Sequence, residues 1–179
     1  ISMDEPYSGI CGITKDELLT QMSEDIDALA EKMSLTREET IEKLKENYDG
    51  YHFTWPSPDV FNPFSLLNSF ADGKTKAYWF GSGTPTYLIN MLRKFNVLPT
   101  RITKMYAKAS SFDAPTENMT TITPLLYQSG YLTIKDYEPM SEIYTLDIPN
   151  KEIKVGLFEN LLPNYLEGSF AEAGDVTIE

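Results

Sequence analysis

Thr123-Pro124-Leu125-Leu126-Tyr127-Gln128-Ser129-Gly130-Tyr131-Leu132-Thr133-Ile134-Lys135 is the stretch that most narrows the fold. Proline is favoured in the first turn of a helix and glycine just after its end, so residues 123–130 predict a short helix. From Tyr131 to Lys135 the side chains alternate with the two-residue period of a strand. The stretch therefore predicts a helix that leads directly into a strand.

The residues that follow supply a partner for that strand. Glu142–Ile148 predicts a second strand, and the intervening residues 136–141 have hairpin length. Asn150 is a helix cap, and we expect Pro163 to kink or end the helix that follows it. The apolar face of that helix would consist of Val155, Phe158, Leu161 and Leu162. A helix, a hairpin and a closing helix in this order are the arrangement of a winged-helix module.

Toward the N-terminus the pattern is helical. Thr14-Lys15-Asp16-Glu17 and Thr36-Arg37-Glu38-Glu39 are both capping boxes, which predict two helix starts. The second helix should end at Asp49-Gly50, and the short connection makes a helical hairpin. The first helix would present a single apolar stripe of Leu18, Met22, Ile26, Leu29 and Met33.

Two more helices are expected in the middle of the chain. Asn62-Pro63 opens one that ends at Gly73, with Phe64, Leu67 and Phe70 facing inward. Thr84-Pro85 opens the next, with an apolar face of Leu88, Ile89, Leu92 and Phe95. Residues 100–118 are the least regular, although Ile102, Met105 and Tyr106 allow a further helix.

These segments predict a mainly α fold with a small β-hairpin. A helical, lid-like subdomain over residues 1–111 would precede a winged-helix-like module over 112–168, and residues 169–179 would form a linker toward a following domain. The chain opens on Ile1 rather than Met, and its strand-like end at 176–179 carries no terminal signal. We therefore read both ends as cuts in a longer polypeptide.

Charge and composition exclude several functions. The 179 residues include 27 acidic and 15 basic side chains, a net charge of −12 that opposes binding led by phosphate attraction. No apolar run approaches the roughly 20 residues that span a bilayer, and no secretory signal opens the chain. The single Cys11 fits a reducing, cytoplasmic location.

The sequence offers no catalytic or metal-binding residues that we can assign. His52 is the only histidine and Cys11 has no second cysteine, so neither a histidine-rich site nor a thiolate pair can form. Residues 81–84, Gly-Ser-Gly-Thr, lack the Lys-Ser/Thr ending of a phosphate-binding loop. We interpret His52 as a loop histidine satisfied by its neighbours rather than as a general base.

One basic window goes against the overall sign of charge. Arg93, Lys94, Arg101, Lys104 and Lys108 lie in a stretch without any acid. Such a cluster can face a nucleotide phosphate or another acidic surface, which makes Arg93 and Arg101 weak candidates for nucleotide contact. The alternative is a solvated face that offsets the acidic N-terminal hairpin.

A winged helix raises the question of DNA binding. The presumed recognition segment, residues 121–130, contains no Arg or Lys, and from Asp113 onward 12 acids face 3 lysines. Phosphate contacts come largely from basic side chains, so we expect this module to contact protein rather than nucleic acid.

The loop that follows the helical hairpin is rich in aromatic residues. Aromatic side chains are favoured at binding hot spots, so the loop is predicted to serve as a docking surface as well as a core element. The candidate docking residues are Tyr48, Asp49, Tyr51, His52, Phe53 and Trp55. The alternative is that every ring packs inward.

Several separated motifs together resemble one family. The motifs are Tyr48-Asp49-Gly50-Tyr51-His52-Phe53, Val60-Phe61-Asn62-Pro63-Phe64-Ser65-Leu66-Leu67, Tyr78-Trp79-Phe80, Gly83-Thr84-Pro85-Thr86, Leu126-Tyr127-Gln128-Ser129-Gly130-Tyr131-Leu132, and Tyr144 through Ile153. In this order they are similar to the AAA-ATPase-like family of bacterial P-loop proteins, over nearly the whole chain from Gly9 to about Leu166.

The resemblance implies a place in a larger protein. In that family a P-loop ATPase core precedes such segments, and a PD-(D/E)XK nuclease-like domain commonly follows them. This chain would then be a non-catalytic regulatory portion with no cofactor of its own, while ATP and Mg²⁺ belong to the parent protein. Its expected partners are the ATPase core and the nuclease-like domain of the same polypeptide. A self-contained protein-interaction module, independent of nucleotide, is the alternative.

Overall fold

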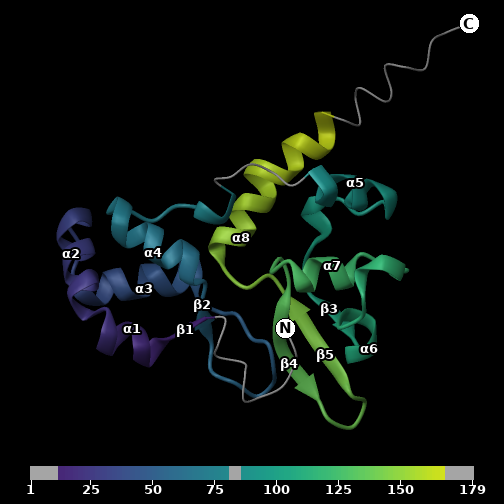
Figure 1. The fold of residues 1–179 in the computed structure, drawn as a ribbon, viewed down its shortest axis with the longest axis horizontal. Coiled ribbons are helices and arrows are strands. Elements are labelled where there is room, and N and C mark those ends of the chain that lie inside the picture. Colours follow the sequence, from purple (N-terminus) through teal and green to yellow (C-terminus); the bar gives the residue numbers. More distant parts are fainter. Residues whose placement is uncertain (1–11, 81–85, 168–179) are drawn as a thin grey trace, which may run out of the picture.

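A computed structural model describes residues 12–80 and 86–167 (Figure 1). The described chain is mainly helical with two small antiparallel sheets, which confirms the predicted fold class. The helices of residues 15–72 gather at one end of the molecule, and a three-stranded sheet with its own short helices lies at the other. The final helix runs between the two. None of the described helices is both long and apolar enough to cross a membrane.

The N-terminal helices are α1 (Lys15–Gln21), α2 (Ser23–Met33) and α3 (Arg37–Tyr48), and both capping boxes form. The prediction of one continuous first helix is wrong, because the backbone of Met22 leaves the helical region at φ −119°. Directly after this break, the Arg37 guanidinium donates to the Ser23 carbonyl at 3.1 Å and to its hydroxyl at 2.9 Å. The contact holds the start of α3 against the start of α2.

Helix α4 (Pro63–Asp72) starts and ends as predicted. Asn62 Oδ1 accepts the Phe64 N–H at 3.0 Å, and Gly73 adopts a left-handed conformation at φ 74°. The predicted inward face is wrong for Phe64 and Leu67, which are 53% and 52% exposed, whereas Phe70 is partly buried against the core as predicted. The buried side instead carries Ser65, Leu66 and Ser69. Ser65 belongs there because its hydroxyl donates to a buried carboxylate, that of Glu152.

A short 3-10 turn, η2 (Tyr78–Phe80), leads toward helix α5 (Thr86–Lys94). Leu88, Ile89 and Leu92 of α5 are buried as predicted. The expected lead-in at 81–84 and the cap at Thr84-Pro85 lie outside the described residues.

Two small sheets complete the fold. Strand β1 (Ile13–Thr14) pairs with β2 (Val60–Phe61). The second sheet has the antiparallel order β3-β5-β4, formed by β3 (Met105–Ala107), β4 (Thr133–Glu138) and β5 (Ile143–Asp147). The β4–β5 hairpin confirms the predicted strand pair. A helix through Ile102, Met105 and Tyr106 is wrong, because Met105 and Tyr106 pair with Leu146 and Thr145 of β5.

Short helices lie between β3 and β4. They are α6 (Ala109–Phe112), η4 (Thr116–Asn118) and α7 (Thr123–Gln128), and η3 (Pro99–Arg101) precedes β3. The predicted helix before the hairpin is α7. Gly130, at φ 81°, makes the turn after it.

The last helix continues past the predicted proline break. Asn150 caps α8 (Lys151–Gly156), a wider π turn η5 covers Leu157–Leu161, and residues 162–167 are helical again. Pro163 has no N–H, and its ring would crowd the carbonyl four residues earlier, so a widened turn accommodates it. The buried positions Ile153, Leu157 and Leu161 are spaced four residues apart, as on one face of a regular helix. Leu157 is buried in place of the predicted Phe158, which is 47% exposed.

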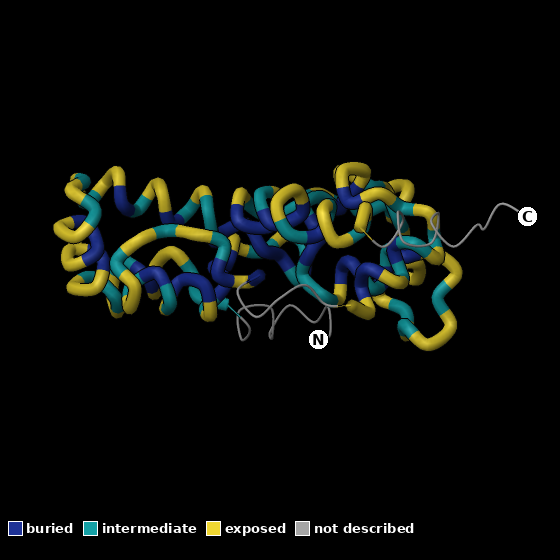
Figure 2. The backbone as a smooth tube through the Cα atoms, turned by 90° about the horizontal axis from the view of Figure 1, so that it is seen from above, coloured by how far each residue is buried: buried dark blue, intermediate teal, exposed yellow. Residues whose placement is uncertain are grey.

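Two apolar clusters form the core. The smaller lies among α1–α4 and consists of Leu18, Ile26, Leu29, Leu44, Tyr48, Phe61, Leu66 and Tyr78. The larger runs from Tyr51 to Leu161 and packs the sheet against its helices and α8. Figure 2 shows buried positions along the whole length of the molecule. The predicted boundary at residues 111/112 remains a prediction, and β3 pairs with β5 across it.

Candidate functional site

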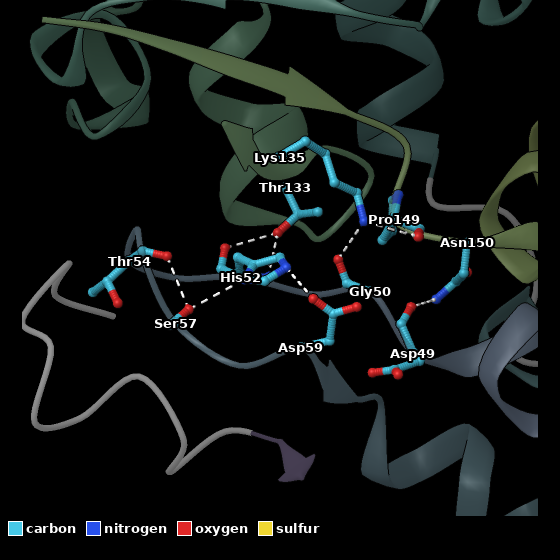
Figure 3. A network of polar contacts seen from close by, with 10 residues as sticks. All are labelled: Asp49, Gly50, His52, Thr54, Ser57, Asp59, Thr133, Lys135, Pro149 and Asn150. Atoms are coloured by element: carbon cyan, nitrogen blue, oxygen red, sulfur yellow. Dashed lines mark hydrogen bonds and ion pairs between the residues drawn. The ribbon is translucent and has the colours of Figure 1, made fainter. Parts of the chain in front are cut away.

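The loop after α3 connects the helical end to the sheet. Tyr51 and Val60 exchange backbone hydrogen bonds at 3.2 and 3.1 Å, which closes the loop on itself. The Lys135 ammonium donates to the Gly50 carbonyl at 2.6 Å and to the Pro149 carbonyl at 3.2 Å (Figure 3). Asn150 Nδ2 donates to the Asp49 carbonyl at 2.9 Å. These contacts fix the loop to β4 and to the start of α8.

Gly50 is required at the point of closest approach. Its φ is +95°, and an added Cβ would overlap the Pro149 carbonyl oxygen. Only glycine combines a positive φ with so close a contact to the Pro149 backbone. Gly50 therefore allows the loop to pack against the residues before α8, in addition to ending α3.

His52 is buried inside this loop. Its backbone N–H donates to the Thr133 hydroxyl at 2.8 Å, and that hydroxyl donates to the His52 carbonyl at 2.8 Å. On the ring, Nδ1 lies 3.2 Å from Ser57 Oγ and Nε2 contacts the Asp59 carboxylate (Figure 3). Burial lowers the pKa of His52 and outweighs the opposing effect of Asp59. Both ring nitrogens have partners, as the sequence interpretation expected.

The contact of Ser57, His52 and Asp59 joins the three residue types of a hydrolase triad. Ser57 is flanked by Pro56 and Pro58, so neither neighbour supplies the backbone N–H that would stabilise an oxyanion. The Ser57 hydroxyl also lies 3.0 Å from the Thr54 carbonyl as a donor. The geometry favours a structural network over a nucleophile and its base.

The predicted docking residues divide by burial. Tyr48, Asp49, Tyr51 and His52 are buried, so a partner cannot reach them in this conformation, whereas Phe53 and Trp55 are half-buried. The Tyr48 hydroxyl donates to the Lys76 carbonyl at 2.8 Å. Burial raises the pKa of Tyr48 to about 12. The docking prediction therefore stays open for Phe53 and Trp55.

An apolar pocket of about 490 Å³ lies beside this loop. Its walls come from the loop, the start of α4, η2 and the end of α7, and include Tyr51, Phe53, Phe64, Trp79, Tyr127 and Gly130. The rings of Phe64 and Trp79 meet edge to face with centroids 6.3 Å apart, and Trp79 is 40% exposed. Sequence reasoning missed this pair because it placed Phe64 inward and treated Trp79 only as part of a motif.

Glu152 is a buried carboxylate close to the pocket wall. It is 1% exposed, and it accepts hydrogen bonds from Ser65 Oγ at 2.8 Å and from the Trp79 N–H at 3.3 Å. Burial raises the pKa of Glu152 to about 7. The carboxylate therefore joins α4, η2 and α8. Sequence reasoning missed it because an acid in the first turn of a helix is ordinarily a solvated partner of the helix dipole.

The two candidate nucleotide contacts have different surroundings. The Arg93 guanidinium donates to the carbonyls of Asn164 and Tyr165 at 2.9 and 3.1 Å, which ties α5 to the last helix. Arg101 is exposed at the end of η3. Within residues 12–80 and 86–167, no group of three or more His, Cys, Asp or Glu side chains is placed to hold a metal ion. Cys11 lies outside the described residues.

Comparison with known proteins gives one informative relative. The protein described as "Uncharacterized protein in vnfD 5'region" from Azotobacter chroococcum mcd 1 is 33% identical over 170 residues. The match covers 93% of this chain and 30% of the relative, so the chain spans less than a third of that protein's length. No family model matches the sequence, and no solved structure matches it.

Proposed function

We propose that this chain is a non-catalytic regulatory portion of an AAA-ATPase-like protein and that it docks on a P-loop core elsewhere in the polypeptide. The observation that carries the proposal is the exposed Phe64–Trp79 pair that lines an apolar pocket. ATP and Mg²⁺ would belong to the core, and the parent protein would act in the cytoplasm. The match to 30% of a longer relative supports a portion of a larger protein.

The arrangement of the sheet supports the winged-helix part of the proposal. Elements follow the order α5, β3, α6, α7, β4, β5, and the sheet order is β3-β5-β4. A helix-helix unit between the first strand and a terminal hairpin is the plan of a winged helix. α7, which would be its recognition helix, has no Arg or Lys, and this supports a protein-contact module rather than a DNA-binding one.

The aromatic pair has the properties of a docking site. Large rings bury much area with few rotatable bonds, and such residues carry a disproportionate share of binding energy. Leu67 lies one turn beyond Phe64 on α4 and is also half-exposed, which extends the apolar surface. Phe53, a half-buried residue of the predicted docking set, also lines this pocket.

Glu152 provides a route from the docking site to the rest of the molecule. The backbone of Trp79 donates to this carboxylate, and Glu152 lies in the first turn of α8. A partner that shifts Trp79 would change that hydrogen bond and hence the position of α8 relative to α4. This is the proposed path from ATPase core to winged helix.

The test uses the complete parent protein. Phe64→Ala and Trp79→Ala should uncouple ATP turnover from the winged-helix portion, whereas Tyr87→Ala, an equally exposed ring on α5, should not. A reading frame without a Gly-x-x-x-x-Gly-Lys-Ser/Thr motif before this segment would contradict the proposal outright. Normal turnover and coupling in both ring variants would also overturn it.

The alternative is a self-contained interaction module that needs no nucleotide. The same exposed rings favour it, because a hydrophobic docking patch serves a separate protein as well as a neighbouring domain. The two proposed functions differ in whether partner binding depends on nucleotide. A partner that binds the chain equally well with and without ATP on the parent protein would support the alternative.

A further inference from the structure

A second hollow adjoins the apolar pocket. It has a volume of about 370 Å³, and Asp113, Ala114 and Pro115 line it on one side. Its other lining residues are shared with the apolar pocket, namely Phe53, Tyr127 and Gln128. The two hollows therefore share one wall, and we call the second one the Asp113 hollow.

The charge of this surface is negative and unpaired. Among the described residues that line the two hollows, only Asp113 is charged. Its side chain is exposed and takes part in no ion pair within residues 12–80 and 86–167. Lys108 is the nearest cation along the chain, but it lines neither hollow. A ligand that enters the Asp113 hollow would therefore meet a carboxylate without a competing cation.

Gln128 adds an oxygen acceptor to the shared wall. Its Nε2 donates to the carbonyls of Phe112 and Ala114, at 3.3 and 2.6 Å. Because the amide nitrogen is directed at these two carbonyls, the amide oxygen points away from them. Gln128 thus offers Oε1 to a donor on a ligand.

The same wall carries two aromatic rings, those of Phe53 and Tyr127. Phe53 is half-buried and Tyr127 is buried. Burial raises the pKa of Tyr127, and the negative charge of Asp113 raises it further, as expected for a carboxylate close to the ring. A carboxylate, an amide oxygen and aromatic faces all favour a cation.

We propose that the Asp113 hollow binds the guanidinium group of an arginine on the segment that docks here, while an apolar side chain of the same segment enters the apolar pocket. This inference rests on the proposed docking at the Phe64–Trp79 pair and names the chemistry of its partner. A guanidinium is planar, so it can stack on a ring while its N–H groups donate to the Asp113 carboxylate and to Gln128 Oε1. A lysine ammonium lacks that planar shape and should bind less tightly.

Other classes of ligand suit this surface less well. A phosphate or an acidic peptide would find no Lys or Arg among the described residues that line the two hollows, on a chain whose net charge is −12. A metal ion would find too few ligands, since no group of three or more His, Cys, Asp or Glu side chains is placed to hold one in the described part of the chain.

The binding test uses the 179-residue chain and a displayed library of random peptides. Enriched peptides should combine a large apolar residue with an arginine a few positions away. In fluorescence anisotropy, an enriched peptide should bind saturably, and replacing its arginine by citrulline, which is neutral and nearly the same shape, should weaken binding about threefold to tenfold.

The variants of the chain separate the two parts of the site. Asp113→Asn keeps the size of the side chain and removes its charge, so it should weaken binding of the arginine peptide and leave the citrulline peptide unchanged. Phe64→Ala and Trp79→Ala should weaken both peptides. The matched control is Glu117→Gln, which removes an equally exposed acid that lines neither hollow and should change neither affinity.

Three results would overturn the proposal. They are enrichment of peptides without arginine, equal affinity for the arginine and citrulline peptides, and equal weakening by Glu117→Gln, which would show general electrostatics. These results are distinct from failure of the proposed function. If Phe64→Ala and Trp79→Ala uncouple the parent protein while Asp113→Asn has no effect there or on the peptides, the docking site stands and its arginine partner is wrong.

Discussion

Gly156 of α8 lies directly against the ring of Phe80, and a Cβ added at Gly156 would overlap three atoms of that ring. Phe80 is 7% exposed and belongs to the larger core, so it has little room to move. Gly156→Ala should therefore lower the free energy of unfolding by about 1 to 3 kcal/mol, despite the better helix propensity of alanine. Urea denaturation followed by circular dichroism measures the change.

The control for this substitution is Lys154→Ala, two residues earlier on the exposed side of the same helix. It should leave stability within about 0.5 kcal/mol. If Gly156→Ala proved as stable as this control, Phe80 would not be fixed in the position described.

Glu152 should make stability depend on pH. The unfolded carboxyl releases its proton near pH 4.5 and the folded one near 7, so between these values the folded state binds more protons. The free energy of unfolding should then fall as pH rises from 4.5 to 7, by up to about 3 kcal/mol, and level off above 7. Glu152→Gln, which keeps an acceptor for the Trp79 N–H, should remove that fall.

Comparing wild type with Glu152→Gln isolates the contribution of the Glu152 carboxyl to the pH dependence. His52 has a lowered pKa, so it contributes the opposite slope below pH 6.5, but it is present in both proteins. Chemical denaturation at pH 5 and pH 8 gives the difference. A parallel pH profile for wild type and Glu152→Gln would show that this carboxyl does not titrate as described.

Alanine substitutions at Arg93 and at Arg101 should have different effects on the free energy of unfolding. Arg93→Ala removes two charged hydrogen bonds between α5 and residues 164–165 of the final helix and should cost about 1 to 3 kcal/mol, whereas Arg101→Ala should cost little. Hydrogen exchange of residues 157–167 should accelerate only in Arg93→Ala. Equal protection in both variants would mean that Arg93 does not hold the final helix against α5.

Local signals in the sequence predicted where helices begin but not which sides they bury. The caps at Thr14, Thr36, Asn62 and Asn150 form as expected because each depends on residues within three positions. The face of α4 was mispredicted because Ser65 is held by Glu152, 87 positions later. β3 escaped notice for a similar reason, since three residues of strand depend on pairing with β5 about 40 positions away.

The same holds for the candidate site, where the sequence predicted which residues gather but not which of them are buried. The aromatic loop was recognised from its composition, and the His52 ring was expected to have hydrogen-bond partners nearby. Composition does not predict how deeply each side chain is buried. Tyr51 and Trp79 are both aromatic and both line the pocket, yet one is 8% and the other 40% exposed. Which ring remains accessible depends on contacts between the loop, η2 and α7, which are distant in sequence.

The final prediction uses that difference in depth. Tyr51→Ala should lower the free energy of unfolding of this chain by about 3 to 5 kcal/mol, because it would leave a cavity in the larger core. Trp79→Ala and Phe64→Ala remove rings that are already 40% and 53% exposed, so each should cost about 1 to 2 kcal/mol. Thermal denaturation of the three variants gives the order directly. A loss for Phe64→Ala as large as that for Tyr51→Ala would mean that the ring supports the core, and a surface that supports the core is not free to receive a partner.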